Sequence, residues 1–224
     1  MLMFIGHFAV ALAAKKTAPK VSLGTLIFAA QLVDLLWPML ILAGVEIVRI
    51  APGITAFTPL DFERYPITHS MAGAIVWSFI FGAGYFLVRK HGRESIVLGA
   101  LVFSHWLLDL LTHRPDLQLL PGLDTRVGLG LWNSVAATVI VEGGLFAAGA
   151  FVYIRATKAR DRMGDWALHG LLAFLLVIYV MNIVSPPPPG PEAIGYAGLA
   201  MWLFVPWGWW IDRHRVRRRG KAEG

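Results

Sequence analysis

One segment near the middle of the chain, "SHWLLDLLTHRPD" at 104–116, places four potential metal or proton ligands in a leucine-rich run: His105, Asp109, His113 and Asp116. His105 and Asp109 are four residues apart, which puts them on one helical face, and His113 continues that face for another turn. Imidazoles and carboxylates bind zinc, manganese or iron, and they also exchange protons. The spacing therefore indicates chemistry, with hydrogen-bonded helix packing as the alternative.

The remainder of the chain is too apolar for an ordinary soluble domain. Its 224 residues are 57% hydrophobic and 15% charged, and the mean hydropathy is +0.62. A spanning helix needs about 20 apolar residues, and six runs are candidates: 21–45, 68–88, 95–112, 130–154, 167–184 and 193–211. We therefore expect an all-α, polytopic transmembrane helix bundle with six full spans plus a short N-terminal helix. It forms one domain, 1–211, followed by a basic cytoplasmic tail, 212–224.

Charge alternates along the connections between these runs. Basic clusters occupy every second connection: 15–20, 89–93, 155–162 and 213–221. The positive-inside rule places these clusters and the C-terminus in the cytoplasm of a bacterial inner membrane. The lysines of the first cluster follow the apolar run 1–14, so we expect the N-terminus outside. The alternative is that 1–14 forms an amphipathic helix on the cytoplasmic surface.

Several classes of site are excluded by composition. The chain has no cysteine, so a metal must bind nitrogen and oxygen ligands. No glycine-rich phosphate loop suggests nucleotide use. The basic tail is explained as the cytoplasmic anchor of the last helix, so no nucleic acid partner is expected. The expected partners are membrane lipid and a lipid or phosphoester substrate.

Ionisable side chains within the apolar runs are the strongest functional signal. Such groups are costly in a bilayer unless they are paired, hydrated or metal-bound. The runs contain His7, Asp34, His69, His105, Asp109 and Glu142. At a rise of about 1.5 Å per residue, these groups lie in the middle to outer part of the membrane. We expect them to converge on one cavity that opens to the outside.

Three interpretations of this cluster are open: a metal site, a proton or ion pathway, and hydrogen-bonded packing. The metal interpretation assigns as ligands His7, His69, His105 and Asp109. Asp34 is then either a further ligand or the base that accepts a proton from water. Glu142 is a second candidate base, and its alternative is a protonated acid hydrogen-bonded within the bundle.

Substrate contacts are expected at the outer end of the bundle. The connection 46–67 contains Pro, Gly and aromatic residues, which is typical of a cap at the membrane interface. Arg64 and Arg114 lie at that level and could bind a phosphate or carboxylate, or extend to lipid headgroups. We predict that they bind substrate together with His113 and Asp116.

Four motifs carry a resemblance to a known family: "GHFAVALAA", "LVDLLWP", "YPITHSM" and "SHWLLDLLTHRPDLQLLPG". In this order they resemble the LexA-binding, inner membrane-associated hydrolase family of bacterial membrane-bound metal-dependent hydrolases, over about 5–122. The resemblance implies that the motif residues of the family correspond to His7, Asp34, His69, His105 and Asp109. The family is also similar to zinc-dependent phospholipases C, which implies zinc, with manganese or iron as alternatives, and a phosphoester substrate.

The chain departs from the family pattern at two places. The second helix of the family commonly ends in two aspartates one residue apart and a histidine, whereas Asp34 is followed by Leu-Leu-Trp at 35–37. The family's His-Arg-Gly before Thr-His-Ser is replaced by Arg-Tyr-Pro at 64–66. We therefore expect one metal ion, for which substitute ligands are Glu142, His113 or Asp116.

These observations favour a membrane-bound, metal-dependent hydrolase of a phosphoester or lipid-derived substrate. The alternative is a proton or metal-ion transporter that uses the same His and Asp cluster. A hydrolase needs one buried metal, whereas a transporter needs polar positions along the whole crossing. The cytoplasmic halves of the runs hold few polar residues besides His169, which favours the hydrolase.

Overall fold

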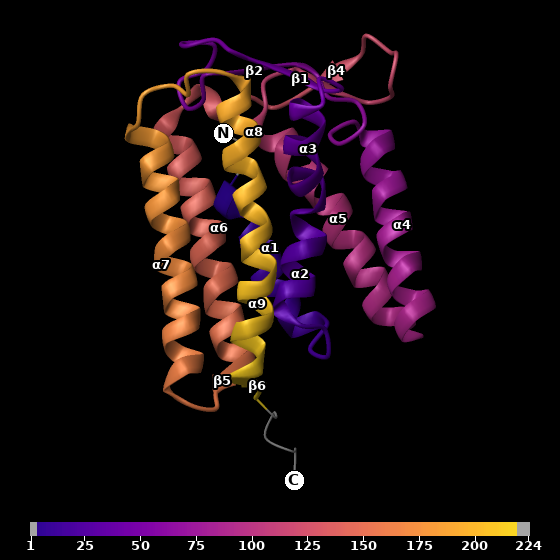
Figure 1. The fold of residues 1–224 in the computed structure, drawn as a ribbon, viewed down its shortest axis with the longest axis vertical. Helices are drawn as coiled ribbons and strands as arrows, with labels where there is room; N and C mark the ends of the chain where they lie inside the picture. The colour runs from indigo at the N-terminus through magenta and orange to yellow at the C-terminus, as the bar shows by residue number, and fades with distance from the viewer. Residues whose placement is uncertain (1–3, 219–224) are drawn as a thin grey trace.

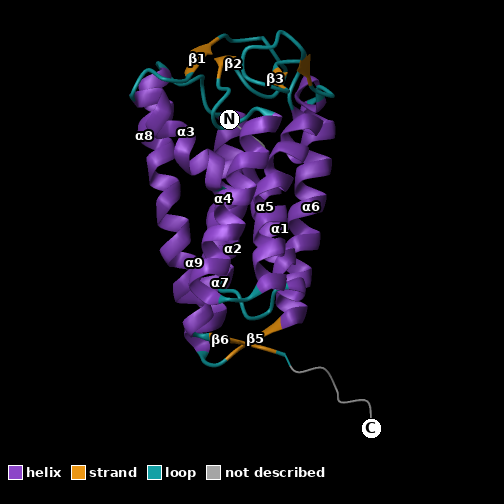
Figure 2. Ribbon diagram, turned by 90° about the vertical axis from the view of Figure 1, so that its right-hand side faces the viewer, coloured by secondary structure: helices purple, strands orange, loops and turns teal. Residues whose placement is uncertain are grey.

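The computed structural model describes residues 4–218, which form a helical bundle with loops and short strands at its two ends (Figures 1 and 2). Its helices are α1 (Phe4–Thr17), α2 (Leu23–Ala30), α3 (Leu32–Leu42), α4 (Met71–Arg89), α5 (Gly92–Thr112), α6 (Val135–Ala156), α7 (Arg162–Val184), α8 (Pro191–Leu199) and α9 (Phe204–Arg213). Two 3-10 turns, η1 (Leu131–Asn133) and η2 (Ala200–Leu203), precede α6 and α9.

Within the described residues, four helices are long and apolar enough to cross a membrane: α4, α5, α6 and α7. The pair α2 and α3 forms a fifth candidate span, bent by 54°. The predicted span 193–211 instead consists of α8, η2 and α9, which follow one another end to end. Pro206 contributes to this interruption because it cannot donate a backbone hydrogen bond to the preceding turn. Six full spans are therefore not confirmed; the helices support four or five.

The short N-terminal helix is found as α1, but it lies inside the bundle. Its 14 residues measure about 21 Å, less than the thickness of a bilayer core. Residues on all of its faces are buried, including Ile5, His7 and Leu12. It packs against α2, α5 and α6. The alternative of an amphipathic helix on the cytoplasmic surface is therefore wrong.

Short antiparallel strand pairs occupy the connections and the segment after α9, which the all-α prediction did not include. At one end β1 (Ile47–Ile50) pairs with β2 (Leu60–Arg64), and β3 (Leu117–Gln118) pairs with β4 (Arg126–Val127). At the other end β5 (Thr157–Ala159) pairs with β6 (Arg215–Arg217) (Figure 2). This strand pairing provides hydrogen-bond partners for the backbone N–H and C=O groups of the extended connections.

The connections that carry the basic clusters gather at a single end of the bundle. The turns between α1 and α2 and between α4 and α5 lie at the same end as β5 and β6 (Figure 1). There the Lys15 Nζ lies 2.7 Å from the Asp212 Oδ2, and the same carboxylate accepts hydrogen bonds from the Leu23 amide and the Tyr153 hydroxyl. The predicted tail thus begins in α9 and β6, while 219–224 lie outside the described residues.

The close contact between α1 and α6 depends on a glycine. A Cβ at Gly149 would collide with the backbone of Ala9 in α1. At Gly144, on the same helix, a Cβ would meet no atom within 4 Å. The backbone of α1 can therefore lie directly against α6 only where α6 lacks a side chain, as is common in membrane bundles.

We expect Gly149→Ala to destabilise the protein by about 1–3 kcal/mol, the usual cost of forcing a methyl group into a packed interface. Thermal unfolding in detergent measures this effect. Gly144→Ala is the control and should keep or raise the unfolding temperature, since alanine is the better helix former. Equal unfolding temperatures for the two variants would contradict the close contact between α1 and α6 at Gly149.

Candidate metal centre

His105 and Asp109 project from one face of α5, as their spacing predicts. Both are buried, and the His105 Nε2 lies 3.3 Å from the Asp109 Oδ2. His113 does not continue this stripe toward the same centre. It is the C-cap of α5, with an extended backbone, and its Nδ1 lies 2.9 Å from the Asp116 Oδ1. The helical face therefore supplies two of the predicted ligands.

The break between α2 and α3 positions Asp34 and orients His105. Asp34 lies in the first turn of α3, and its Oδ1 is 3.4 Å from the His105 Nε2. Ala30 ends α2, and the last carbonyls of a helix lack intrahelical donors. The Ala30 carbonyl accepts a hydrogen bond of 2.8 Å from the His105 Nδ1. That bond places the proton of a neutral His105 on Nδ1, so the Nε2 lone pair faces the carboxylates.

His69, just before α4, is oriented by a chain of hydrogen bonds from the outer connection. The Thr68 hydroxyl donates to the Glu46 Oε2 at 2.6 Å, so its oxygen accepts from the His69 Nδ1, also at 2.6 Å. Glu46 further accepts from the backbone amides of Ile67 and Thr68. The His69 Nε2 consequently presents its lone pair to the centre, 3.3 Å from the Asp34 Oδ1.

His7 reaches the same centre from the first turns of α1. Its Nε2 lies 3.2 Å from the Asp109 Oδ1, and its ring stacks on that of His105 with centroids 3.6 Å apart and planes 6° apart. The five residues that the resemblance implied as motif residues are therefore together and buried. They come from α1, α3, the segment just before α4, and α5.

This arrangement fits a divalent cation. Two sets of ligand atoms lie close enough to hold an ion, His7 with Asp34 and His105, and His69 with His105 and Asp109. Tetrahedral zinc ligands at about 2.0–2.1 Å from the ion are roughly 3.3 Å apart. Four distances between imidazole Nε2 atoms and carboxylate oxygens of Asp34 and Asp109 are 3.3, 3.3, 3.4 and 3.7 Å.

Buried polar atoms without hydrogen-bond partners also indicate that a divalent cation fits this cluster. Between residues 4 and 218, no hydrogen-bond partner is found for the His105 Nε2, the Asp109 Oδ2 or the Asp34 Oδ2. Buried polar atoms are costly unless they are paired or bind a metal. Two carboxylates and one divalent cation would also balance in charge, which favours burial.

Glu142, a predicted base, is buried on α6 beside α1 rather than in either set of ligand atoms. Its carboxylate faces the backbone amides of Ile5 and Gly6 in the first turn of α1. The N-terminus of a helix favours a negative group at this position. The geometry therefore places Glu142 against the helix that carries His7, and its role as a base stays a prediction.

The predicted substrate-binding residues lie nearer the end of the bundle that carries β1 to β4. His113 and Asp116 form a buried network with Tyr65, whose hydroxyl donates to the Asp116 Oδ1 at 3.1 Å. Burial and the Asp116 carboxylate raise the pKa of Tyr65 well above its usual range, so the phenol stays a donor. Arg114 pairs with Asp116 and with Asp61.

Arg64 is exposed and donates a hydrogen bond to the Val45 carbonyl. The contribution of all four residues to substrate binding stays a prediction.

Glu46 and Thr68 were missed by the sequence analysis. An acidic residue in an external connection has the pattern of an ordinary solvated charge, and nothing in its spacing connects it to His69. The adjacency of Thr68 to His69 was visible in "YPITHSM", but it does not reveal hydrogen bonding. Glu46 is only 1% exposed, which distinguishes it from a surface charge.

We expect the purified protein to bind roughly one zinc, manganese or iron ion per chain, the stoichiometry of a mononuclear site. His105→Ala and Asp109→Ala should abolish this binding because each removes a central ligand. Elemental analysis after reconstitution with each cation measures it. His169→Ala is the control, since His169 is exposed and bonds only the Asp165 carbonyl. Full metal content in the His105→Ala, Asp109→Ala double variant would rule out these ligands.

Glu46→Gln should weaken metal affinity by about 10–100-fold, the usual cost of losing a group that orients a ligand. The amide keeps the volume but is a poorer acceptor for the three donors that Glu46 holds. Competition with a metal-sensitive chelating dye measures the change. Glu63→Gln is the matched control, because Glu63 pairs with Arg49 at the surface. Unchanged affinity in Glu46→Gln would show that His69 does not need this support.

Comparison with known proteins identifies the family. A family model described as YdjM inner membrane protein matches residues 3–186, from α1 through α7. Searches of curated proteins and of solved structures gave no match. The matched residues include all five of the His and Asp cluster as well as Glu46. Because the match covers most of the chain, this protein belongs to the YdjM inner membrane protein family.

Proposed function

We propose that this protein is a membrane-bound, metal-dependent hydrolase of a phosphoester or lipid-derived substrate. The observation that carries the proposal is the orientation of His105 and His69. Each donates its Nδ1 proton to a fixed acceptor and turns its Nε2 toward the carboxylates of Asp34 and Asp109. A cation between these atoms would offset the negative charge of the two carboxylates. Zinc is the proposed ion, with manganese or iron as alternatives.

A bound divalent cation would make a water molecule more acidic and polarise the substrate oxygen. Asp34 has one oxygen beside the histidines and the other without a hydrogen-bond partner in the described chain. It is therefore the proposed base. In hydrolysis, the water oxygen bonds to the phosphorus or carbonyl carbon, and the bond from that atom to the leaving oxygen breaks. Asp34 accepts a water proton and passes it to the leaving oxygen.

The core on the other side of the cluster supports a hydrolase over a transporter. Toward the basic end of the bundle, the next residues along the interior of α1 and α5 are apolar and fully buried, including Phe8, Leu12 and Leu98. A proton or ion pathway would need polar positions along this stretch. The gathering of the basic connections at this end supports a cytoplasmic location for it and for the C-terminus. The outer hairpins then face the outside.

We expect metal-loaded protein to hydrolyse an activated phosphodiester or a phospholipid, and chelation to abolish the reaction. Asp34→Asn should lower kcat by about 10²–10⁴-fold, the usual contribution of a general base. The assay is product release in detergent, with metal content measured in parallel. Asp124→Asn, in an exposed loop, is the control.

The transporter alternative predicts a different outcome. Proteoliposomes would then move protons or metal ions across the membrane, measured with an enclosed indicator dye. Transport that depends on Asp34 and Asp109, with no hydrolysis by metal-loaded protein, would contradict the proposed function.

A further inference from the structure

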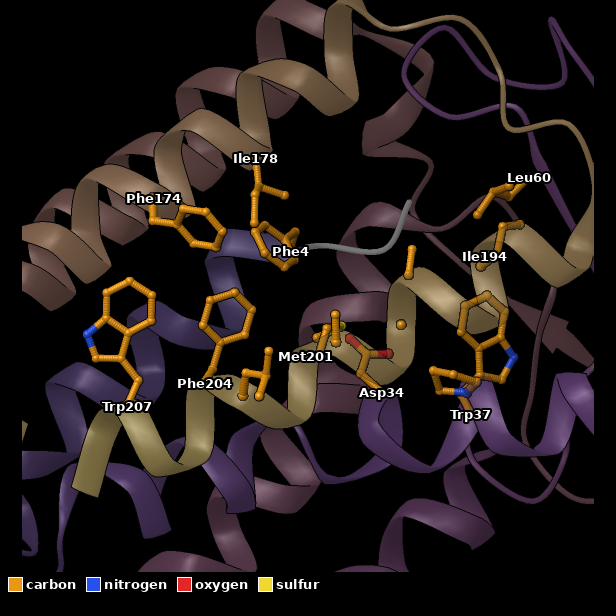
Figure 3. A pocket seen from close by; sticks show the side chains of 15 residues that line it. Phe4, Asp34, Trp37, Leu60, Phe174, Ile178, Ile194, Met201, Phe204 and Trp207 are labelled. Atoms are coloured by element: carbon orange, nitrogen blue, oxygen red, sulfur yellow. The ribbon is translucent and has the colours of Figure 1, made fainter. Parts of the chain in front are cut away.

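An apolar cavity of about 370 Å³ lies between α3, α7 and the helical run α8, η2 and α9 (Figure 3). Its wall is formed mainly by aromatic and aliphatic side chains, among them Phe4, Trp37, Ile178, Met201, Phe204 and Trp207. Among the lining residues that lie within 4–218, Asp34 is the one ionisable side chain. The volume is at the lower end of the range for ligand pockets, and the apolar wall favours a hydrocarbon ligand.

The cavity meets the metal centre at Asp34. The Asp34 Oδ1 faces His69 and His105, whereas its Oδ2 is buried without a hydrogen-bond partner in the described chain. Figure 3 shows the carboxylate on the cavity wall between Met201 and Trp37. A polar group of a ligand at this point would therefore lie beside the candidate metal ligands, and its apolar part would extend along the cavity.

The cavity opens toward the lipid-facing side of the bundle. Phe174 and Leu203 are 45% and 68% exposed, whereas Phe4 and Phe204 are 8% and 5% exposed. A second hollow of about 350 Å³ shares Leu60, Ile194 and Ala197 with the cavity. It continues to the outer connections at 52–59 and 185–188. The two hollows are therefore neighbours, one reaching Asp34 and the other reaching the connections at the end of the bundle.

We propose that a hydrocarbon chain of a bilayer lipid occupies this cavity, entering sideways between α7 and α8, with the polar linkage of the lipid at Asp34. The substrate class is then a lipid ester or phosphoester, an assignment that rests on the proposed function. A soluble polar substrate would leave its polar groups unpaired against this wall. A partner helix, about 10 Å wide, is too large for the cavity, whereas one chain fits.

Photolabelling tests whether the hydrocarbon chain of a lipid occupies the cavity, and it requires neither bound metal nor hydrolysis. The protein is reconstituted in phosphatidylethanolamine and phosphatidylglycerol vesicles that contain a phospholipid with a diazirine in its acyl chain. After irradiation, labelled residues are mapped by mass spectrometry. We expect labels on buried Phe4 and Phe204, in addition to exposed residues such as Val177 and Ile140. Labels confined to exposed residues would overturn the proposal.

Two tryptophan substitutions at alanine positions, one in the cavity lining and one outside it, test whether the labels depend on the cavity. Ala197→Trp fills the cavity at a lining position and should remove the labels from Phe4 and Phe204. Ala173→Trp adds the same side chain to the exposed surface of α7, outside the cavity lining, and should preserve them. Equal labelling in the two variants would show that lipid reaches these residues by another route and would overturn the cavity assignment.

A kinetic comparison tests the substrate class. In metal-loaded protein, Ala197→Trp should lower kcat/KM for a long-chain phospholipid by a larger factor than for a short soluble phosphodiester. An equal effect on both substrates would overturn the assignment. Labelling of Phe4 and Phe204 in chelator-treated protein supports the chain site even if no metal binds. Metal-dependent hydrolysis without such labelling overturns the chain site and leaves the proposed function standing.

Discussion

The burial of two carboxylates without a lysine or arginine beside them is the constraint on which this structure depends. Asp34 and Asp109 form ion pairs in the described chain only with histidines. Coulomb repulsion between the two acids would be large in an apolar interior. Three imidazoles face the two acids, each from a different segment, and a bound cation would offset the repulsion. The short α1, the break between α2 and α3 and the Glu46–Thr68–His69 hydrogen bonds place these imidazoles.

Irregular backbone occurs where the site needs it. A helix in lipid normally satisfies its own backbone groups, so breaks are tolerated only inside protein or beside a cavity. The bend at Gln31 meets both conditions, because the Ala30 carbonyl is satisfied by His105 and Asp34 lines the apolar cavity. The break therefore orients one ligand and exposes another residue to the cavity. A straight span in the place of α2 and α3 would provide neither.

Much of the site was predictable because helical periodicity is local. The spacing of His105 and Asp109 predicts a shared face, and the cost of polar groups in lipid singles out His7, Asp34 and His69. The direction of His113 was not predictable, since it depends on where α5 ends. Glu46 was missed because its contact with Thr68 joins two ends of an external connection. Six full spans were not confirmed, because hydropathy does not reveal the break at Ala200–Leu203.

The short length of α1 has a consequence for biogenesis. A segment of about 21 Å is too short to be inserted into the membrane by itself as a full span. The largest packing partner of α1 is α6. The candidate ligands on α3, just before α4 and on α5 are all synthesised before α6, yet the helix that carries His7 lacks its largest packing partner until α6 is in place. A nascent chain that ends after α5 would therefore carry every ligand and still lack a complete centre. Metal binding by the candidate centre would thereby depend on completion of the second half of the chain.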